Sequence, residues 1–158
     1  MKFFLILLRQ DLQIFIDSLI GSFKLNRIYS LKEITGIWTE TLIIDHRLFD
    51  LYAIIFTLVE NNVSVEALAT FKKEMLTIQA PLVDFSAHFF PNATLQLLQT
   101  FIYFQLIFAF GLYPVTKLSP LKEKAVALSG VAFTPPTFRE VYQTCFYQQV
   151  YCLAKDIT

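Results

Sequence analysis

The sequence contains few residues that build tight turns. It has 4 Gly and 6 Pro among 158 residues, and no stretch alternates polar with apolar residues as a half-buried strand does. Tight turns between short strands depend on glycine and proline, so this scarcity excludes a turn-rich β-sandwich or barrel. What remains is a helical chain, and its length suffices for one domain with its own core.

Groups that ligate metals or act as nucleophiles are also scarce. The two histidines, His46 and His88, fall on different predicted helices without metal-ligand spacing, and no glycine-rich phosphate loop is present. Cys145 and Cys152 share one predicted helix at a separation of about 10 Å, which is too far for a disulfide. These absences predict no catalytic residue, no metal and no cofactor, and the unpaired cysteines favour a reducing cytoplasm.

Charge of one sign is not in excess, because 13 basic residues balance 13 acidic ones. A nucleic-acid-binding surface carries a basic excess, so we expect no direct DNA contact from this segment. Asp84 lies near the apolar stripe of a predicted helix. It is either a ligand-orienting charge in a pocket or an ordinary exposed carboxylate.

Apolar residues, by contrast, are abundant. They make up 55% of the chain and include 17 Phe, above the roughly 45–50% usual for soluble domains. The excess indicates extra buried surface in a subunit interface, a ligand cavity or a membrane. The run over 101–113 is interrupted by Gln105 and followed by Pro114. It falls short of the roughly 18–20 apolar residues that span a bilayer, so we expect no membrane insertion.

Apolar residues that recur every three or four positions predict an all-α fold of about six to seven helices. Ser30 with Glu33, and Thr137 with Glu140, match capping boxes at two helix starts. A short helix is expected between Ser119 and Gly130. The other predicted helices cover residues 3–23, 31–43, 46–60, 64–89, 93–113 and 137–156.

Large aromatic side chains on inward or ambiguous helix faces are candidates for lining an apolar ligand cavity. They are Trp38, Tyr52, Phe56, Phe71, Phe85, Tyr103 and Phe104. For any single one of them ordinary core packing is the simpler explanation, whereas taken together they suit a cavity, and both interpretations stay open.

Three segments carry a resemblance to a known family. They are residues 43–51 (IIDHRLFDL), 58–73 (LVENNVSVEALATFKK) and 108–114 (FAFGLYP). In content and order they resemble the C-terminal half of TetR-family transcriptional regulators, and the succession of helix lengths is similar over the whole chain. The resemblance implies one regulatory domain over residues 1–158, without the helix-turn-helix DNA-binding domain that precedes it in the family.

The resemblance also implies a bacterial, cytoplasmic homodimer that controls transcription, with DNA contacted only through the missing domain. Helices 3–23, 31–43, 46–60 and 64–89 would enclose a small apolar or aromatic effector, whose binding shifts the first helix. Helices 93–113 and 137–156 would pair with their twofold mates in a four-helix interface. The expected contacts are Leu98, Ile102, Gln105, Ala109, Val141, Cys145, Gln148 and Cys152.

A second hypothesis belongs to another class. The same apolar excess suits a helical module that binds a membrane surface or a different protein and has no DNA role. An enzyme is the remotest alternative, because no acid, base or nucleophile constellation emerges from the sequence.

Overall fold

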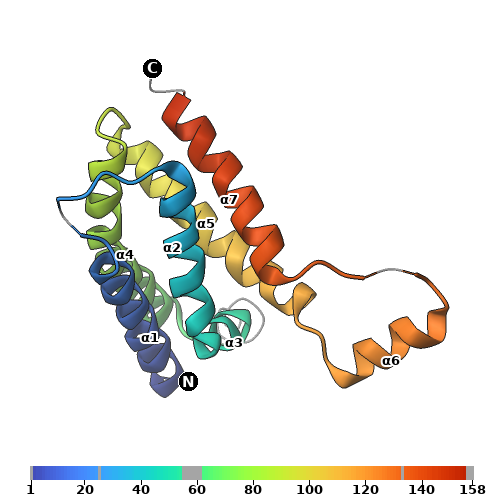
Figure 1. The fold of residues 1–158 in the computed structure, drawn as a ribbon. Coiled ribbons are helices and arrows are strands. Elements are labelled where there is room, and N and C mark those ends of the chain that lie inside the picture. The colour runs from blue at the N-terminus through green and yellow to red at the C-terminus, as the bar shows by residue number, and fades with distance from the viewer. Residues whose placement is uncertain (1, 25, 55–61, 133, 156–158) are drawn as a thin grey trace.

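A computed structural model describes residues 2–24, 26–54, 62–132 and 134–155 (Figure 1). These ranges contain seven helices and no strand, which confirms the predicted all-α bundle. The helices are α1 (Lys2–Gly21), α2 (Leu31–Ile44), α3 (His46–Ile54), α4 (Val65–Phe89), α5 (Leu95–Thr116), α6 (Pro120–Ser129) and α7 (Phe138–Lys155).

The helix starts follow from short-range capping. The Glu33 amide donates to the Ser30 hydroxyl at 3.3 Å, and the Ser30 amide donates to the Glu33 carboxylate at 2.9 Å, so this predicted capping box is confirmed. The hydrogen bond from the Ser30 amide is the main reason that the pKa of Glu33 lies below its ordinary value. Thr137 and Glu140 make the same reciprocal bonds at the start of α7.

One helix extends beyond its expected end. α5 continues to Thr116 instead of ending at 113, with Pro114 inside its last turn. The extra turn persists because its carbonyls find donors: the Lys117 amide bonds Tyr113 O at 2.9 Å and Lys122 Nζ bonds Pro114 O at 2.7 Å. α3 is described to Ile54, and the rest of the predicted helix over 46–60 lies outside the described residues.

The core lies where two groups of helices meet. α1 packs against α2, α3 and α4, whereas α5 packs against α3, α4 and α7, and α2 closes onto α7. Aromatic rings fill these contacts, with Phe146 between Trp38 and Phe101, and Phe49 stacked on Tyr113 with 4.3 Å between ring centroids. α6 stands apart from this body in Figure 1.

Length and apolarity would also let α5 cross a membrane, since the helix continues past Pro114 and has a mean hydropathy of 1.6 over its most apolar window. Among the described residues it is the one helix with these properties. Residues along one side of it, including Leu98, Ile102 and Ala109, are buried against protein. A core helix of a folded domain has the same composition.

One buried charge joins α1 to α3. The Asp11 side chain is fully buried, and both of its oxygens accept hydrogen bonds from Arg47, the Nε bond measuring 2.6 Å. Arg47 itself remains largely exposed. The guanidinium fork satisfies a carboxylate that would otherwise be buried without a counter-charge.

Candidate ligand-binding groove and subunit interface

Most of the aromatic residues predicted to line a cavity belong to a filled core. Trp38, Tyr52 and Phe71 are buried and Phe85 is half-buried. The Tyr52 ring stacks on Phe110 with 3.6 Å between centroids. The cavity beside Trp38 and Phe85 measures about 10 Å³, enough for at most one water molecule. Core packing therefore accounts for these side chains in this conformation.

The other three predicted residues have different positions. Phe56 lies outside the described residues. Tyr103 and Phe104 project from the outer surface of α5 and are 55% and 56% exposed. Neither side chain can line a cavity inside the bundle, but both are available to a ligand or to another chain.

The core also contains polar atoms without partners. Burial raises the pKa of the Tyr142 phenol. The Trp38 indole N–H approaches the Tyr142 hydroxyl and partly offsets this rise, but neither atom has a partner within hydrogen-bond geometry. An unpaired hydroxyl in the core opposes folding, because it loses its bonds to water.

Replacing Tyr142 by phenylalanine is therefore expected to raise the free energy of unfolding by about 1 kcal/mol. Urea unfolding followed by circular dichroism measures this change. Trp38→Phe, which alters packing volume as well, serves as the comparison. A loss of stability in Tyr142→Phe would show that the hydroxyl is bonded in solution and that the core is not simply filled.

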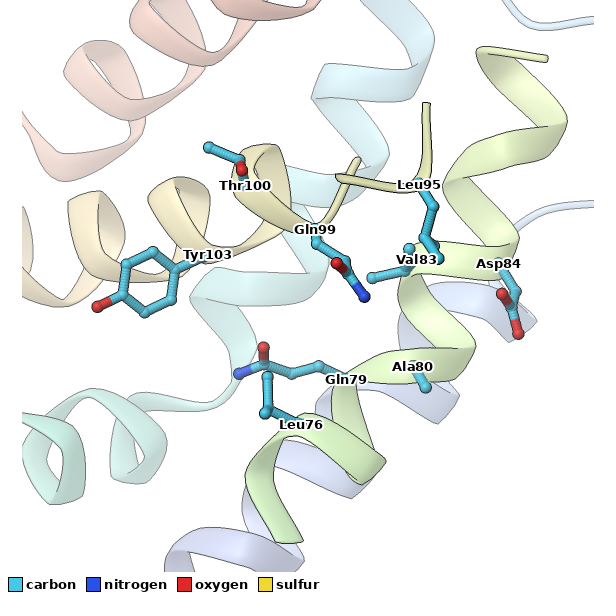
Figure 2. Close-up of a pocket in the computed structure, with 9 residues that line it drawn as sticks. All are labelled: Leu76, Gln79, Ala80, Val83, Asp84, Leu95, Gln99, Thr100 and Tyr103. Atoms are coloured by element: carbon cyan, nitrogen blue, oxygen red, sulfur yellow. The ribbon is translucent and has the colours of Figure 1, made fainter. Parts of the chain in front are cut away.

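An apolar depression forms a groove between α4 and α5. It measures about 590 Å³, within the roughly 300–1,000 Å³ of small-molecule sites. Figure 2 shows the Gln79 and Gln99 amides in the gap between the helices, with Tyr103 and Asp84 at its opposite ends. The other lining residues are Leu76, Ala80, Val83, Leu95 and Thr100.

The groove can hold an apolar molecule and orient it. Leu76, Ala80, Val83 and Leu95 offer aliphatic surface, while the two amides and the Tyr103 hydroxyl can donate or accept hydrogen bonds. Among the described residues that line it, Asp84 is the one that carries a charge. The Asp84 side chain is exposed and also lines this groove, so its role in orienting a ligand stays a prediction.

A second depression, between α1 and α4, is larger and more open, at about 910 Å³. Charged groups line it, and the Arg9–Glu74 ion pair at 3.3 Å crosses from one helix to the other. Water competes well for such a surface, so it suits an apolar ligand less than the α4–α5 groove does.

No three His, Cys, Asp or Glu side chains gather into a metal-binding group within the described ranges. Within the same ranges His46 has Tyr113 as its neighbour, with 3.3 Å between Nδ1 and the hydroxyl. His88 Nδ1 lies 3.1 Å from the Asp84 carbonyl of its own helix. Both histidines are thus accounted for by local contacts.

The residues of α5 predicted to meet a second copy face inward instead. Leu98, Ile102, Gln105 and Ala109 are buried within the chain, so in this conformation their side chains are not available to a second copy. The reason is physical: α5 is apolar on nearly every side, and its pattern does not mark the inner one. The Gln105 amide nitrogen donates to the Gln149 side-chain oxygen and thereby joins α5 to α7.

The predicted residues of α7 lie on the surface beside α5. Gln148 and Cys152 are exposed, and Val141 and Cys145 are half-buried. Because Gln149 bonds Gln105, helical spacing places these residues along the outer side of the α5–α7 contact. On α5 the adjoining residues, at spacings of three and four, are Leu97, Thr100, Phe104, Ile107 and Gly111.

We call these two rows together the α5–α7 face. Leu97 and Phe104 are large and exposed, while Thr100 and Gly111 are small enough to let another backbone approach. Thr100 also lines the α4–α5 groove, so the groove and the α5–α7 face are continuous. On α5 the residues of this face recur in the sequence at spacings of three and four. This row can be told from the other apolar rows of α5 only once the buried side of the helix is known.

Comparison with known proteins supplies a family match. A family model described as a tetracyclin repressor-like C-terminal domain matches residues 9–149. No curated protein and no solved structure matches the chain. The matched segment begins within α1 and ends within α7, and it includes the groove and all of the α5–α7 face except Cys152. The chain therefore belongs to the family of TetR-like C-terminal regulatory domains.

Proposed function

We propose that the chain is the ligand-sensing and dimerisation domain of a bacterial, cytoplasmic transcriptional regulator. The family match over residues 9–149 carries this proposal, because TetR-family domains generally dimerise and bind small-molecule effectors. The exposed α5–α7 face supports a homodimer formed through four helices. Phe104 lies near its middle, and a large exposed aromatic there is a typical interface anchor.

The effector site in this proposal is the α4–α5 groove. Its aliphatic lining and its two amides favour a mostly apolar molecule with one or two hydrogen-bonding groups. Tyr103 lines this groove and keeps the ligand-binding role expected from the sequence.

The effector acts on DNA binding through α1. α4 lines the groove on one side and packs against α1 on the other. Arg9–Glu74 joins α1 to α4, and Asp11–Arg47 joins α1 to α3. A ligand that binds one arrangement of α4 better than another shifts the population of α1 positions. α1 then changes the spacing of the DNA-binding domains to which such domains are joined in the family.

A transcriptional reporter tests this function. The chain is fused behind a helix-turn-helix domain that represses only as a dimer, and cells are exposed to a panel of aromatic alcohols, aromatic amides and medium-chain alcohols. We expect the fusion to repress and at least one panel member to relieve repression. Failure to repress would contradict dimerisation, and repression that no panel member relieves would contradict the proposed effector class.

Two matched variants locate the effector site. Ala80→Trp fills the groove with an indole and is expected to abolish the response while repression stays. Ala69→Trp makes the same change at an exposed position of α4 outside the groove and is expected to respond as the parent does. If Ala80→Trp responds normally, the effector binds elsewhere.

Flotation with vesicles of phosphatidylglycerol and phosphatidylcholine separates this proposal from the membrane or partner-binding alternative. That alternative is favoured by the apolarity of α5. We expect the chain to stay in the dense fraction, because the inner side of α5 is already buried and a second copy covers the outer side. Co-flotation would favour the alternative.

A further inference from the structure

The depression between α1 and α4 carries more positive than negative side chains. The two helices pack side by side (Figure 1), and the depression between them measures about 910 Å³. Arg9 from α1, Arg47 from α3 and Lys73 from α4 line it, whereas Glu74 is the one carboxylate among its described lining residues. A concave surface with an excess of one charge concentrates small ions of the opposite charge. The depression therefore favours an anion.

The excess positive charge comes from Lys73. Arg9 lies 3.3 Å from the Glu74 carboxylate, and Arg47 pairs with the buried Asp11. The Lys73 ammonium, by contrast, makes no hydrogen bond and no ion pair with any residue that the structure describes. One positive charge at this depression thus remains without a counter-charge.

Arg47 adds hydrogen-bond donors that are held in place. A guanidinium has five N–H donors, and the bonds to Asp11 use those of Nε and Nη2. Nη1 makes no hydrogen bond within the described part of the chain. Because Asp11 is fully buried, it anchors the plane of the guanidinium, and the remaining donors face a ligand at little cost in side-chain entropy. Such donors match the geometry of a carboxylate.

The same depression offers aliphatic surface. Ile14 is 55% exposed and Ile78 is half-buried, and both line it. The hydroxyls of Thr70 and Thr77 donate to carbonyls of their own helix, at 2.9 and 3.1 Å. A ligand with a short apolar part and one charged end fits this surface. The single unbalanced charge of Lys73 suits a monoanion better than a phosphate, which carries nearly two charges at neutral pH.

We propose that the α1–α4 depression binds a small aliphatic carboxylate. Lys73 supplies the counter-charge, the free donors of Arg47 bind the carboxylate, and the aliphatic chain lies on Ile14 and Ile78. This site shares no lining residue with the α4–α5 groove, so it is a second ligand site, and it does not depend on the proposed dimer. Its ligand contacts α1, α3 and α4 together.

Isothermal titration calorimetry of the full chain with hexanoate and with 1-hexanol tests this site. The two probes share one aliphatic chain and differ in charge. We expect hexanoate to bind at one site per chain, at least about tenfold more tightly than 1-hexanol. Equal affinities would show that charge plays no part and would overturn the proposal. An absence of hexanoate binding up to about 10 mM would overturn it as well.

Matched variants locate the binding site. Lys73→Gln and Lys73→Glu are expected to weaken hexanoate binding, the latter at least about tenfold. Lys72→Glu changes net charge equally at a neighbouring exposed position of α4 that does not line the depression, and should stay within about twofold of the parent. Ala80→Trp, which blocks the α4–α5 groove, should also bind hexanoate as the parent does.

Circular dichroism establishes that each variant stays helical. Weaker binding confined to the two Lys73 variants supports the second site. Parental affinity in both Lys73 variants, or an equal loss in Lys72→Glu, overturns it. A loss in Ala80→Trp would place hexanoate in the α4–α5 groove, which overturns the second site and leaves the proposed effector groove standing.

Discussion

Replacing Phe104 by glutamate is expected to turn the dimer into a monomer while the fold stays intact. Phe104 is 56% exposed in the single chain and lies near the middle of the α5–α7 face. Near a twofold axis the substitution brings two like charges together and removes two buried rings. Each ring contributes about 1.5–3 kcal/mol when covered, so the dissociation constant should rise at least about 100-fold.

Sedimentation velocity over a concentration series measures this effect. Ile14→Glu is the matched control, because Ile14 is 55% exposed on α1, away from the α5–α7 face. It should leave the dissociation constant within about twofold, and circular dichroism should show that both variants stay helical. A Phe104→Glu protein that dimerises like the parent would place the interface on another surface.

Replacing Arg47 by alanine should lower the free energy of unfolding more than replacing any other charged residue on the surface of α1 or α3. The Asp11 carboxylate is fully buried and has Arg47 as its hydrogen-bond partner. Breaking a buried pair leaves an uncompensated charge and typically costs about 3–5 kcal/mol. Arg47 is itself 62% exposed, which admits water, so we expect a loss at the lower end of this range. The melting temperature should fall by roughly 6–12 °C.

Two further variants isolate the cause. Arg9→Ala removes an arginine from the exposed pair with Glu74 and should change stability by less than about 1 kcal/mol. Asp11→Asn, added to Arg47→Ala, should recover part of the loss because an amide needs no counter-charge. If Arg47→Ala is as mild as Arg9→Ala in thermal unfolding, the buried carboxylate finds water and does not depend on Arg47.

Helix starts could be predicted from the sequence because capping is local. Ser30 and Glu33 lie three residues apart, and no distant contact is needed to form their reciprocal bonds. The burial of Asp11 was not predictable in this way, since its partner Arg47 lies 36 positions along the chain. By sequence alone Asp11 belongs among the polar residues of α1.

The positions of the proposed interface and of the groove could not be predicted from the spacing of apolar residues along single helices. α5 is apolar all round, so the inward side of Leu98 and Ile102 could not be told from the outward side of Phe104. Whether the core was filled or hollow depended on side-chain packing among Trp38, Phe85 and Phe146. α6 was predicted as a helix, but the exposure of all its residues emerged only from the fold.

The central claim is that a second copy of the chain covers the α5–α7 face. Light scattering coupled to size exclusion, from about 1 to 100 μM, tests it most directly through the molar mass in solution. A mass of twice 18.3 kDa that falls toward 18.3 kDa in Phe104→Glu is the predicted result. A parent protein that stays at 18.3 kDa throughout this range would contradict it.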